Sequence, residues 1–186
     1  MPTAPSSPAC SAGSSTASTD RADGRLWFVT EVFSAGVLVY RHGADGIEVL
    51  LGHLGGPLWA KKDASAWSIP KGEYVPEEES ARVAAAREFT EELGLPVPEG
   101  EWTALGEVRY GSGNRRKTVT AWAVEGDLDP ADVVPGTFEM EWPPRSGRRA
   151  EFPEIDRAAW FDPATALDKL GKGQRPFLTR LTELIG

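Results

Sequence analysis

The chain has 186 residues, of which 28 are acidic and 20 basic, and its formal net charge is −8 at pH 7. This acidic balance excludes a protein that coats nucleic acid, because such proteins carry a basic footprint for the phosphate backbone. The length predicts one domain with a full hydrophobic core. The single cysteine, Cys10, excludes an intramolecular disulfide and a cysteine zinc cluster.

The first residues differ in composition from the rest of the chain. Residues 1–24 are rich in Ser, Ala, Thr, Pro and Gly and have almost no large apolar side chain. Such a segment cannot offset the entropy lost on ordering, so we predict a disordered tail at 1–24 and a domain at 25–186. The tail has neither the basic nor the apolar region of a secretory signal, and no run is long enough to span a bilayer. We therefore expect a soluble, cytoplasmic protein that binds neither membrane nor nucleic acid; its oligomeric state is left open.

Two strands open the predicted domain. Residues 32–40 form an apolar run typical of a buried strand, and Gly-Ala-Asp-Gly at 43–46 predicts a turn into a second strand at 47–53. Gly-Gly-Pro at 55–57 begins a loop that we expect to continue to residue 67.

A helix is predicted over residues 77–93. Pro76 is followed by three glutamates, a helix-start signal in which acids meet the positive end of the helix dipole. Gly94 fits the left-handed position after the last turn, and Pro96 prevents continuation.

The second half of the chain predicts more strands and two helices. Expected are a hairpin of strands 105–110 and 118–124, an irregular segment at 142–144, a strand at 158–161, and helices at 163–170 and 176–185. Strands mixed with a central and a terminal helix indicate an α/β fold.

Three glutamates concentrate like charge on the central helix. Glu88, Glu91 and Glu92 stand at i, i+3 and i+4, so their carboxylates share one face. Like charges at this spacing oppose helix formation by about 0.2–0.5 kcal/mol per pair. One interpretation is a solvated acidic face. The other is a site for a hard cation such as Mg²⁺, Mn²⁺ or Ca²⁺.

The setting of these glutamates resembles the signature of the Nudix hydrolase family. That signature is a Gly, five residues, a Glu, seven residues, then Arg-Glu-apolar-x-Glu-Glu-x-Gly-apolar. Residues 87–95 match its ending, and seven residues separate Arg87 from Glu79. Six residues, not five, separate Gly72 from Glu79; counting from Gly72 would instead select Glu78. We favour Glu79, because a loop tolerates an insertion better than a helix does.

The resemblance implies a Nudix-type α/β/α sandwich with a mixed β-sheet, and a metal site for Mg²⁺ or Mn²⁺. The implied metal ligands are Gly72, Glu88, Glu91 and Glu92, and Glu92 is the one we expect to be least dispensable. Arg87 lies four residues before Glu91 and is expected to orient it. Glu79 and Gly94 are expected to have structural roles in the motif.

A further acidic residue is implied near the end of the chain. Many family members carry an acid about six residues before a tryptophan in a late strand, and Glu154 precedes Trp160 by six. We favour Glu154 over Glu151, and regard Glu139 and Glu141 as weaker candidates. The general base is then Glu88 or Glu154.

The chemistry implied by the resemblance is hydrolysis of a nucleoside diphosphate linked to another group. Bound divalent ions would neutralise the pyrophosphate and lower the pKa of an attacking water. The candidate substrate-binding residues are Lys71, Trp67, Tyr74 and Arg115. Residues 67–72 resemble the Trp-x-x-Pro-Lys-Gly entry of diadenosine tetraphosphate hydrolases. Those enzymes usually carry a tyrosine shortly before the late tryptophan, where this chain has Arg-Ala-Ala at 157–159.

Four functions follow in order of preference. The first is hydrolysis of a dinucleoside polyphosphate, and the second is a housecleaning pyrophosphatase for oxidised or noncanonical nucleoside triphosphates. The third is a Nudix module that binds a nucleotide without cleaving it, and the fourth is a domain that metal merely stabilises. Retention of every signature glutamate favours an enzyme over the last two.

Overall fold

The structure is a computed structural model that describes residues 14–17, 28–112 and 114–185. The strands are β1 (Ser14–Ala17), β2 (Phe28–Gly43), β3 (Gly46–Leu54), β4 (Trp67–Ser68), β5 (Lys71–Tyr74), β6 (Trp102–Ser112), β7 (Arg115–Glu125), β8 (Thr137–Glu141), β9 (Arg149–Pro153) and β10 (Ile155–Phe161). The helices are α1 (Ala81–Leu93), α2 (Pro163–Lys169) and α3 (Arg175–Ile185), with a 3₁₀ turn, η1, at Pro130–Asp132.

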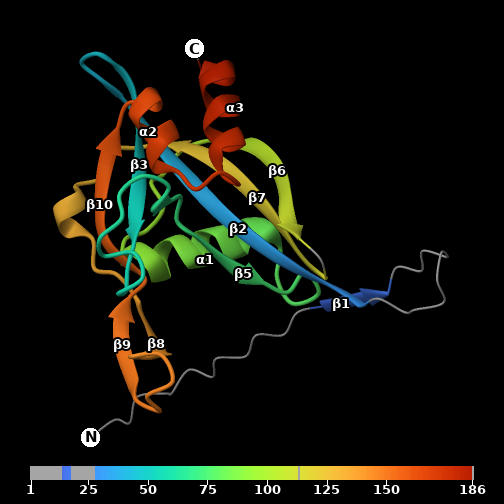
Figure 1. Cartoon of the computed structure of the whole chain (residues 1–186). Helices are drawn as coiled ribbons and strands as arrows, with labels where there is room; N and C mark the ends of the chain where they lie inside the picture. The colour runs from blue at the N-terminus through green and yellow to red at the C-terminus, as the bar shows by residue number, and fades with distance from the viewer. Residues whose placement is uncertain (1–13, 18–27, 113, 186) are drawn as a thin grey trace, which may run out of the picture.

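The long strand β2 lies at the centre of a mixed sheet with the order β10-β3-β2-β7-β6 (Figure 1). It runs parallel to β7, from Thr30 opposite Arg115 to Tyr40 opposite Glu125. It is antiparallel to β3 through its last residues and to β5 through residues 33–36. Its middle section is buried on both faces, as the predicted apolar run requires.

Helices cover both faces of the sheet (Figure 1). On one face, Phe89 and Leu93 of α1 share a core with Val37 and Leu50. On the other face, residues of α2 and α3, including Phe177, pack with Leu38 and Leu51. The predicted α/β/α sandwich with a mixed sheet is therefore confirmed. No helix among the described residues is long and apolar enough to cross a membrane.

The start of α1 differs from the prediction. The helix begins at Ala81 rather than at residue 77, because Ser80 is its N-cap and accepts a hydrogen bond from Val83 N. The glutamates before Ser80 form a turn in which Val75 O accepts from the backbone N–H groups of both Glu78 and Glu79. The predicted end is correct: Gly94 has φ +69°, and a Cβ there would lie 2.4 Å from Val134 O.

Two features of the strands were not predicted. The hairpin of β8 and β9 was not expected, and the segment 142–144, predicted to be irregular, lies in its connection. The period-two alternation of Phe138 and Met140 with polar residues is its sequence signal. Residues 14–17, predicted to be disordered, pair with β2 as strand β1. The remainder of the predicted tail, apart from these four residues, lies outside the described part of the chain.

Candidate functional site

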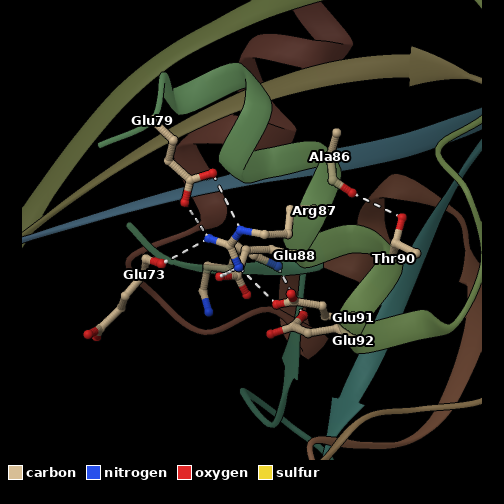
Figure 2. Close-up of polar contacts among 9 residues, drawn as sticks. Glu73, Glu79, Ala86, Arg87, Glu88, Thr90, Glu91 and Glu92 are labelled. Carbon is tan, nitrogen blue, oxygen red and sulfur yellow. Dashed lines mark hydrogen bonds and ion pairs between the residues drawn. The ribbon is translucent and has the colours of Figure 1, made fainter. Parts of the chain in front are cut away.

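Arg87 lies at the centre of an acidic cluster on α1 (Figure 2). Its Nη1 lies 2.6 Å from Glu88 Oε1 and 2.8 Å from Glu91 Oε2. Its Nη2 lies 2.6 Å from Glu79 Oε1 and donates to Glu73 O at 3.4 Å. One cation thus contacts three carboxylates and the backbone of β5, and its contact with Glu91 is the one that the predicted orienting role requires.

The structure brings Glu79, and not Glu78, against this arginine. Both carboxylate oxygens of Glu79 meet the guanidinium, since Nε also donates to Glu79 Oε2 at 3.4 Å. The Glu78 side chain is exposed. Compared with the family spacing, this chain has one extra residue between Gly72 and Glu79. The turn before the helix accommodates it, and there the backbone N–H groups of Glu78 and Glu79 both donate to Val75 O.

Glu92 is held at the deep end of the cluster. Its Oε2 accepts a hydrogen bond of 3.0 Å from the backbone N–H of Lys71, which leads into the Gly72 loop. Burial raises the pKa of Glu92 to about 7, although the charge of Lys71 acts in the opposite direction. Burial likewise lowers the pKa of Lys71. Ionisation of either group therefore carries a desolvation cost.

Gly72 and Glu88 approach so closely that a larger residue at position 72 would displace the Glu88 carboxylate. A Cβ on Gly72 would lie 1.6 Å from Glu88 Oε2, because β5 crosses directly over this face of α1. Burial raises the pKa of Glu88, and the nearby charges of Glu91 and Glu154 add to that effect. The Gly72 backbone and the Glu88 carboxylate are therefore direct neighbours.

Glu154 faces the α1 glutamates from the junction of β9 and β10. Its backbone N–H donates to Gly136 O and its carbonyl accepts from Gly55 N, both at 2.9 Å. Burial raises the pKa of the Glu154 carboxyl, and the charge of Glu91 raises it further. Glu151 instead accepts a hydrogen bond from Thr137 Oγ1 across the β8–β9 hairpin.

Glu139 and Glu141, the two weaker candidates for the late acidic residue, also make their contacts within the β8–β9 hairpin. Glu139 pairs with Arg149 at 3.0 Å, and Glu141 accepts from the backbone of Gly147. Of the four late acids weighed from the sequence, Glu154 is therefore the one that the fold brings to the cluster.

The donor set fits a divalent cation in its chemistry. Glu88, Glu91, Glu92 and Glu154 offer the hard carboxylate oxygens that such an ion prefers. Burial raises the pKa values of Glu88, Glu92 and Glu154, and the charges of neighbouring carboxylates add to this effect. Among the described residues, no three acidic, histidine or cysteine side chains converge on one point. The contacts with Arg87 explain this, since they hold Glu88 and Glu91; a bound ion would compete with Arg87 for these two carboxylates.

Of the four predicted substrate-binding residues, one lies in the core and a second is half-buried. Trp67 is only 4% exposed, and its ring lies 4.8 Å from that of Phe161 and 5.1 Å from that of His53. The prediction that it contacts substrate is therefore wrong, because both neighbours already cover the ring. Tyr74 is half-buried against the α1 side of the sheet, with its ring edge-on to Phe33 at 6.3 Å.

The other two lie on the side of β5 that faces away from α1. Arg115 is exposed and lines a cleft of about 390 Å³, whereas Lys71 is opposite Gly36 on β2 and is not among the lining residues. The cleft is also lined by Glu73 and Tyr110, which were not foreseen from the sequence, and by Lys117, which belongs to the same basic stretch as Arg115. Glu73 accepts from Lys117 Nζ at 3.2 Å, so it contacts both the cleft and, through its carbonyl, Arg87. The sequence signal for Tyr110 is the predicted hairpin, because the register of its two strands decides which β6 residue lies opposite Lys117.

Comparison with known proteins identifies the family. A family model described as NUDIX domain matches residues 32–181. A comparison with curated proteins finds no match to the sequence. Among solved structures, a binary complex of an Ap4A hydrolase from C. elegans is 22% identical with a TM-score of 0.59, over 83% of this chain and 97% of that chain.

Two further solved structures have similar scores. The MutT protein from Methanosarcina mazei Go1 is 19% identical with a TM-score of 0.56, over 84% of this chain and 96% of that chain. The NUDIX domain of NrtR from Shewanella oneidensis, solved with ADP ribose, is 12% identical with a TM-score of 0.57, over 86% and 91%.

At these identities the solved structures show the fold alone, whereas the family model covers most of the chain, including the whole of α1 and its glutamates. The chain is therefore a member of the Nudix hydrolase family, whose members act on compounds in which a nucleoside diphosphate is linked to another group.

Proposed function

We propose that the protein hydrolyses a pyrophosphate bond of a nucleoside polyphosphate with the help of Mg²⁺ or Mn²⁺. The observation that carries this proposal is the cluster of carboxylates around Glu92. Glu88 and Glu92 are desolvated, and both lie close enough to Glu154 for its charge to affect them. Gly72, Glu88, Glu91 and Glu92 would hold the metal. When bound, the metal would neutralise the pyrophosphate and lower the pKa of a coordinated water.

Glu154 is the general base in this proposal. Glu88, the alternative, already accepts a hydrogen bond from Arg87 at 2.6 Å. No hydrogen bond to the Glu154 carboxylate is found within the described residues, so this group is available to a water molecule. Its half-buried position raises its pKa, and a raised pKa makes a carboxylate a better proton acceptor near neutral pH.

Arg87 and Lys71 support the reacting groups. Arg87 is anchored by Glu79 and fixes the directions of Glu88 and Glu91, so its removal acts through those two carboxylates. The Lys71 backbone fixes Glu92, and its ammonium group contacts a substrate phosphate.

The substrate class that we propose is a dinucleoside polyphosphate such as diadenosine tetraphosphate. Its support is the Trp-x-x-Pro-Lys-Gly entry at residues 67–72 and the shared fold with an Ap4A hydrolase. The second candidate is an oxidised or noncanonical nucleoside triphosphate. It is favoured by Ala158 and Ala159 on β10, where the dinucleotide enzymes usually have a tyrosine.

Product analysis with Mg²⁺ or Mn²⁺ tests both candidates. Diadenosine tetraphosphate, ordinary and 8-oxo deoxynucleoside triphosphates, ADP-ribose and NADH are each incubated with the full-length protein and separated by chromatography. ATP plus AMP from diadenosine tetraphosphate supports the first candidate; pyrophosphate release from an oxidised triphosphate supports the second. Binding of a nucleotide without turnover would replace both with a non-catalytic module.

Three variants assign the roles. Glu92→Gln removes a metal-binding carboxylate at the deep end of the cluster and should abolish turnover. Glu154→Gln should lower kcat by about 10²–10⁴-fold, the range for loss of a general base. Glu151→Gln is the matched control on the same segment and should retain full activity; equal losses in the two variants would refute the assignment of Glu154.

A further inference from the structure

Strand β10 pairs with β3 along one edge of the sheet (Figure 1), and a β-bulge interrupts this pairing near the start of β10. Ile155 is opposite Leu54. The next pair is Arg157 with His53, so Asp156 has no partner on β3. One extra residue on a strand moves the side chains before it to the opposite face of the sheet. The bulge therefore decides which side chains the start of β10 presents to α1.

The core contacts of β10 show the effect of this extra residue. Ile155 and Trp160 both pack in the core that α1 covers. They are five residues apart, and in a regular strand residues at an odd separation face opposite sides of the sheet. The bulge brings them to one face. Without it, Ile155 would leave this core, and Glu154 would turn away from α1 with it.

The Glu154 carboxylate meets α1 at Gly136. A Cβ on Gly136 would lie 2.7 Å from Glu91 O and 3.4 Å from Glu154 Oε2. The Glu154 carbonyl accepts a hydrogen bond of 2.9 Å from Gly55 N, which ties it to the residue after β3. The direction of the carboxylate thus depends on the register of β3 against the start of β10.

A buried histidine holds the bulged residue. His53 is fully buried, and its Nδ1 lies 2.8 Å from Asp156 Oδ1. Its Nε2 donates to Lys62 O at 2.8 Å, since a carbonyl oxygen can only accept. The ring of Trp67 lies edge-on to the imidazole at 5.1 Å. A shift of β10 by one residue would leave Nδ1 buried without a partner, and the cost of that opposes the shift.

We propose that His53 and Asp156 are positioning residues for Glu154, because their contact holds the bulge that turns its carboxylate toward the α1 glutamates. That Glu154 is the general base rests on the proposed function, whereas the held bulge rests on the pairing of β3 with β10. Bulges are common beside active sites, where they redirect a side chain in this way. His53 is itself fully buried, so it acts through Asp156 and does not touch the substrate.

Amide hydrogen exchange, followed by NMR on the full-length protein, tests the bulge apart from catalysis. Asp156→Ala removes the partner of His53, so the backbone N–H groups of Gly55 and Glu154 should exchange about tenfold faster. Asp156→Asn can donate to or accept from Nδ1 and should restore the original rates. Asp168→Ala is the matched control, because it makes the same substitution at an exposed position on α2. Unchanged rates in Asp156→Ala would overturn the inference.

Steady-state kinetics then connect the bulge to the reaction. With diadenosine tetraphosphate and Mg²⁺, Asp156→Ala should lower kcat about tenfold and leave KM unchanged, since no group that binds substrate is removed. In the Glu154→Gln protein the same substitution should change kcat by less than about twofold, because the group that it positions is already lost. Equal losses in both backgrounds would show that Asp156 acts on the fold as a whole, and would overturn the inference.

The two measurements separate this inference from the proposed function. If exchange responds to Asp156→Ala but Glu154→Gln alone leaves kcat unchanged, the proposed base is refuted and the held bulge is retained. Without turnover of the dinucleotide the proposed substrate is refuted, and exchange alone decides. If Asp156→Ala fails to fold, Asp156→Glu, which displaces the carboxylate by one methylene group, replaces it in both measurements.

Discussion

At the residue scale, Arg87 depends on Glu79 to keep its guanidinium in place. Glu79→Gln removes the charge from that contact and leaves Arg87 free to move toward Glu88 and Glu91. We expect activity to fall by about tenfold, the loss typical of residues that orient metal ligands. Glu78→Gln is the matched control, because its side chain is exposed one residue away. Steady-state assays of both variants test this, and a larger loss in Glu78→Gln would show that the motif register begins at Gly72 instead.

Glu92 makes the stability of the metal-free protein depend on pH. Its pKa is raised to about 7 in the folded state, so the protonated carboxyl is the form that stabilises folding. That contribution is fully present below the unfolded pKa near 4.5 and is lost as the pH rises through about 7. The free energy of unfolding in EDTA should therefore fall by about 1–3 kcal/mol between pH 5 and pH 8. Urea unfolding at several pH values measures it, and Glu92→Gln should flatten the profile; an unchanged slope would assign the effect to another group.

At the element scale, the start of α1 depends on one side chain. Ser80 caps the helix through Val83 N, so Ser80→Ala should lower the free energy of unfolding by about 1 kcal/mol. Ser80→Asp keeps a capping oxygen and is the control, which should retain the stability. Urea unfolding of the three proteins checks the order. A Ser80→Ala variant as stable as the parent would show that this cap does not stabilise α1.

The elements show where sequence reasoning succeeds. The end of α1 was predictable because Gly94 is required by a left-handed φ, which few other residues adopt. Its start was not, since three acids after Pro76 and a serine four residues later both signal a helix start, and only the structure shows that the serine caps the helix through Val83 N. The β8–β9 hairpin was missed because its five-residue strands are short and prolines interrupt the segment between them.

At the scale of the whole molecule, metal and fold stabilise each other. An ion that binds only the folded cluster stabilises the protein by about 2.7 kcal/mol when its concentration is 100 times its Kd. For a chain of this size we therefore expect Mg²⁺ to raise Tm by about 5–10 °C. Differential scanning calorimetry with Mg²⁺ and with EDTA measures the shift. Glu92→Gln should lose most of it; an equal shift in that variant would place the ion elsewhere.

The assembled site combines what sequence predicts with what only folding supplies. Spacing along one helix was enough to place Glu88, Glu91 and Glu92 on a common face. The cleft could not be predicted from the sequence. Tyr110 and Glu73 come close to Lys117 only because β6 pairs with β7 and β5 pairs with β2. Trp67 was misassigned for the same reason: nothing local shows that Phe161 and His53 cover its ring.

The hydrogen bond from Glu154 N to Gly136 O closes the chain at the base of the β8–β9 hairpin. It joins the residue just before the hairpin to the residue just after it, so residues 137–153 leave and re-enter the domain at the same point. The backbone at Gly136 is in turn fixed to Glu91 O. A peptide of different length could therefore be spliced between these two residues while the carboxylate of Glu154 keeps its position, which makes the hairpin a natural place to attach a reporter or a second binding module.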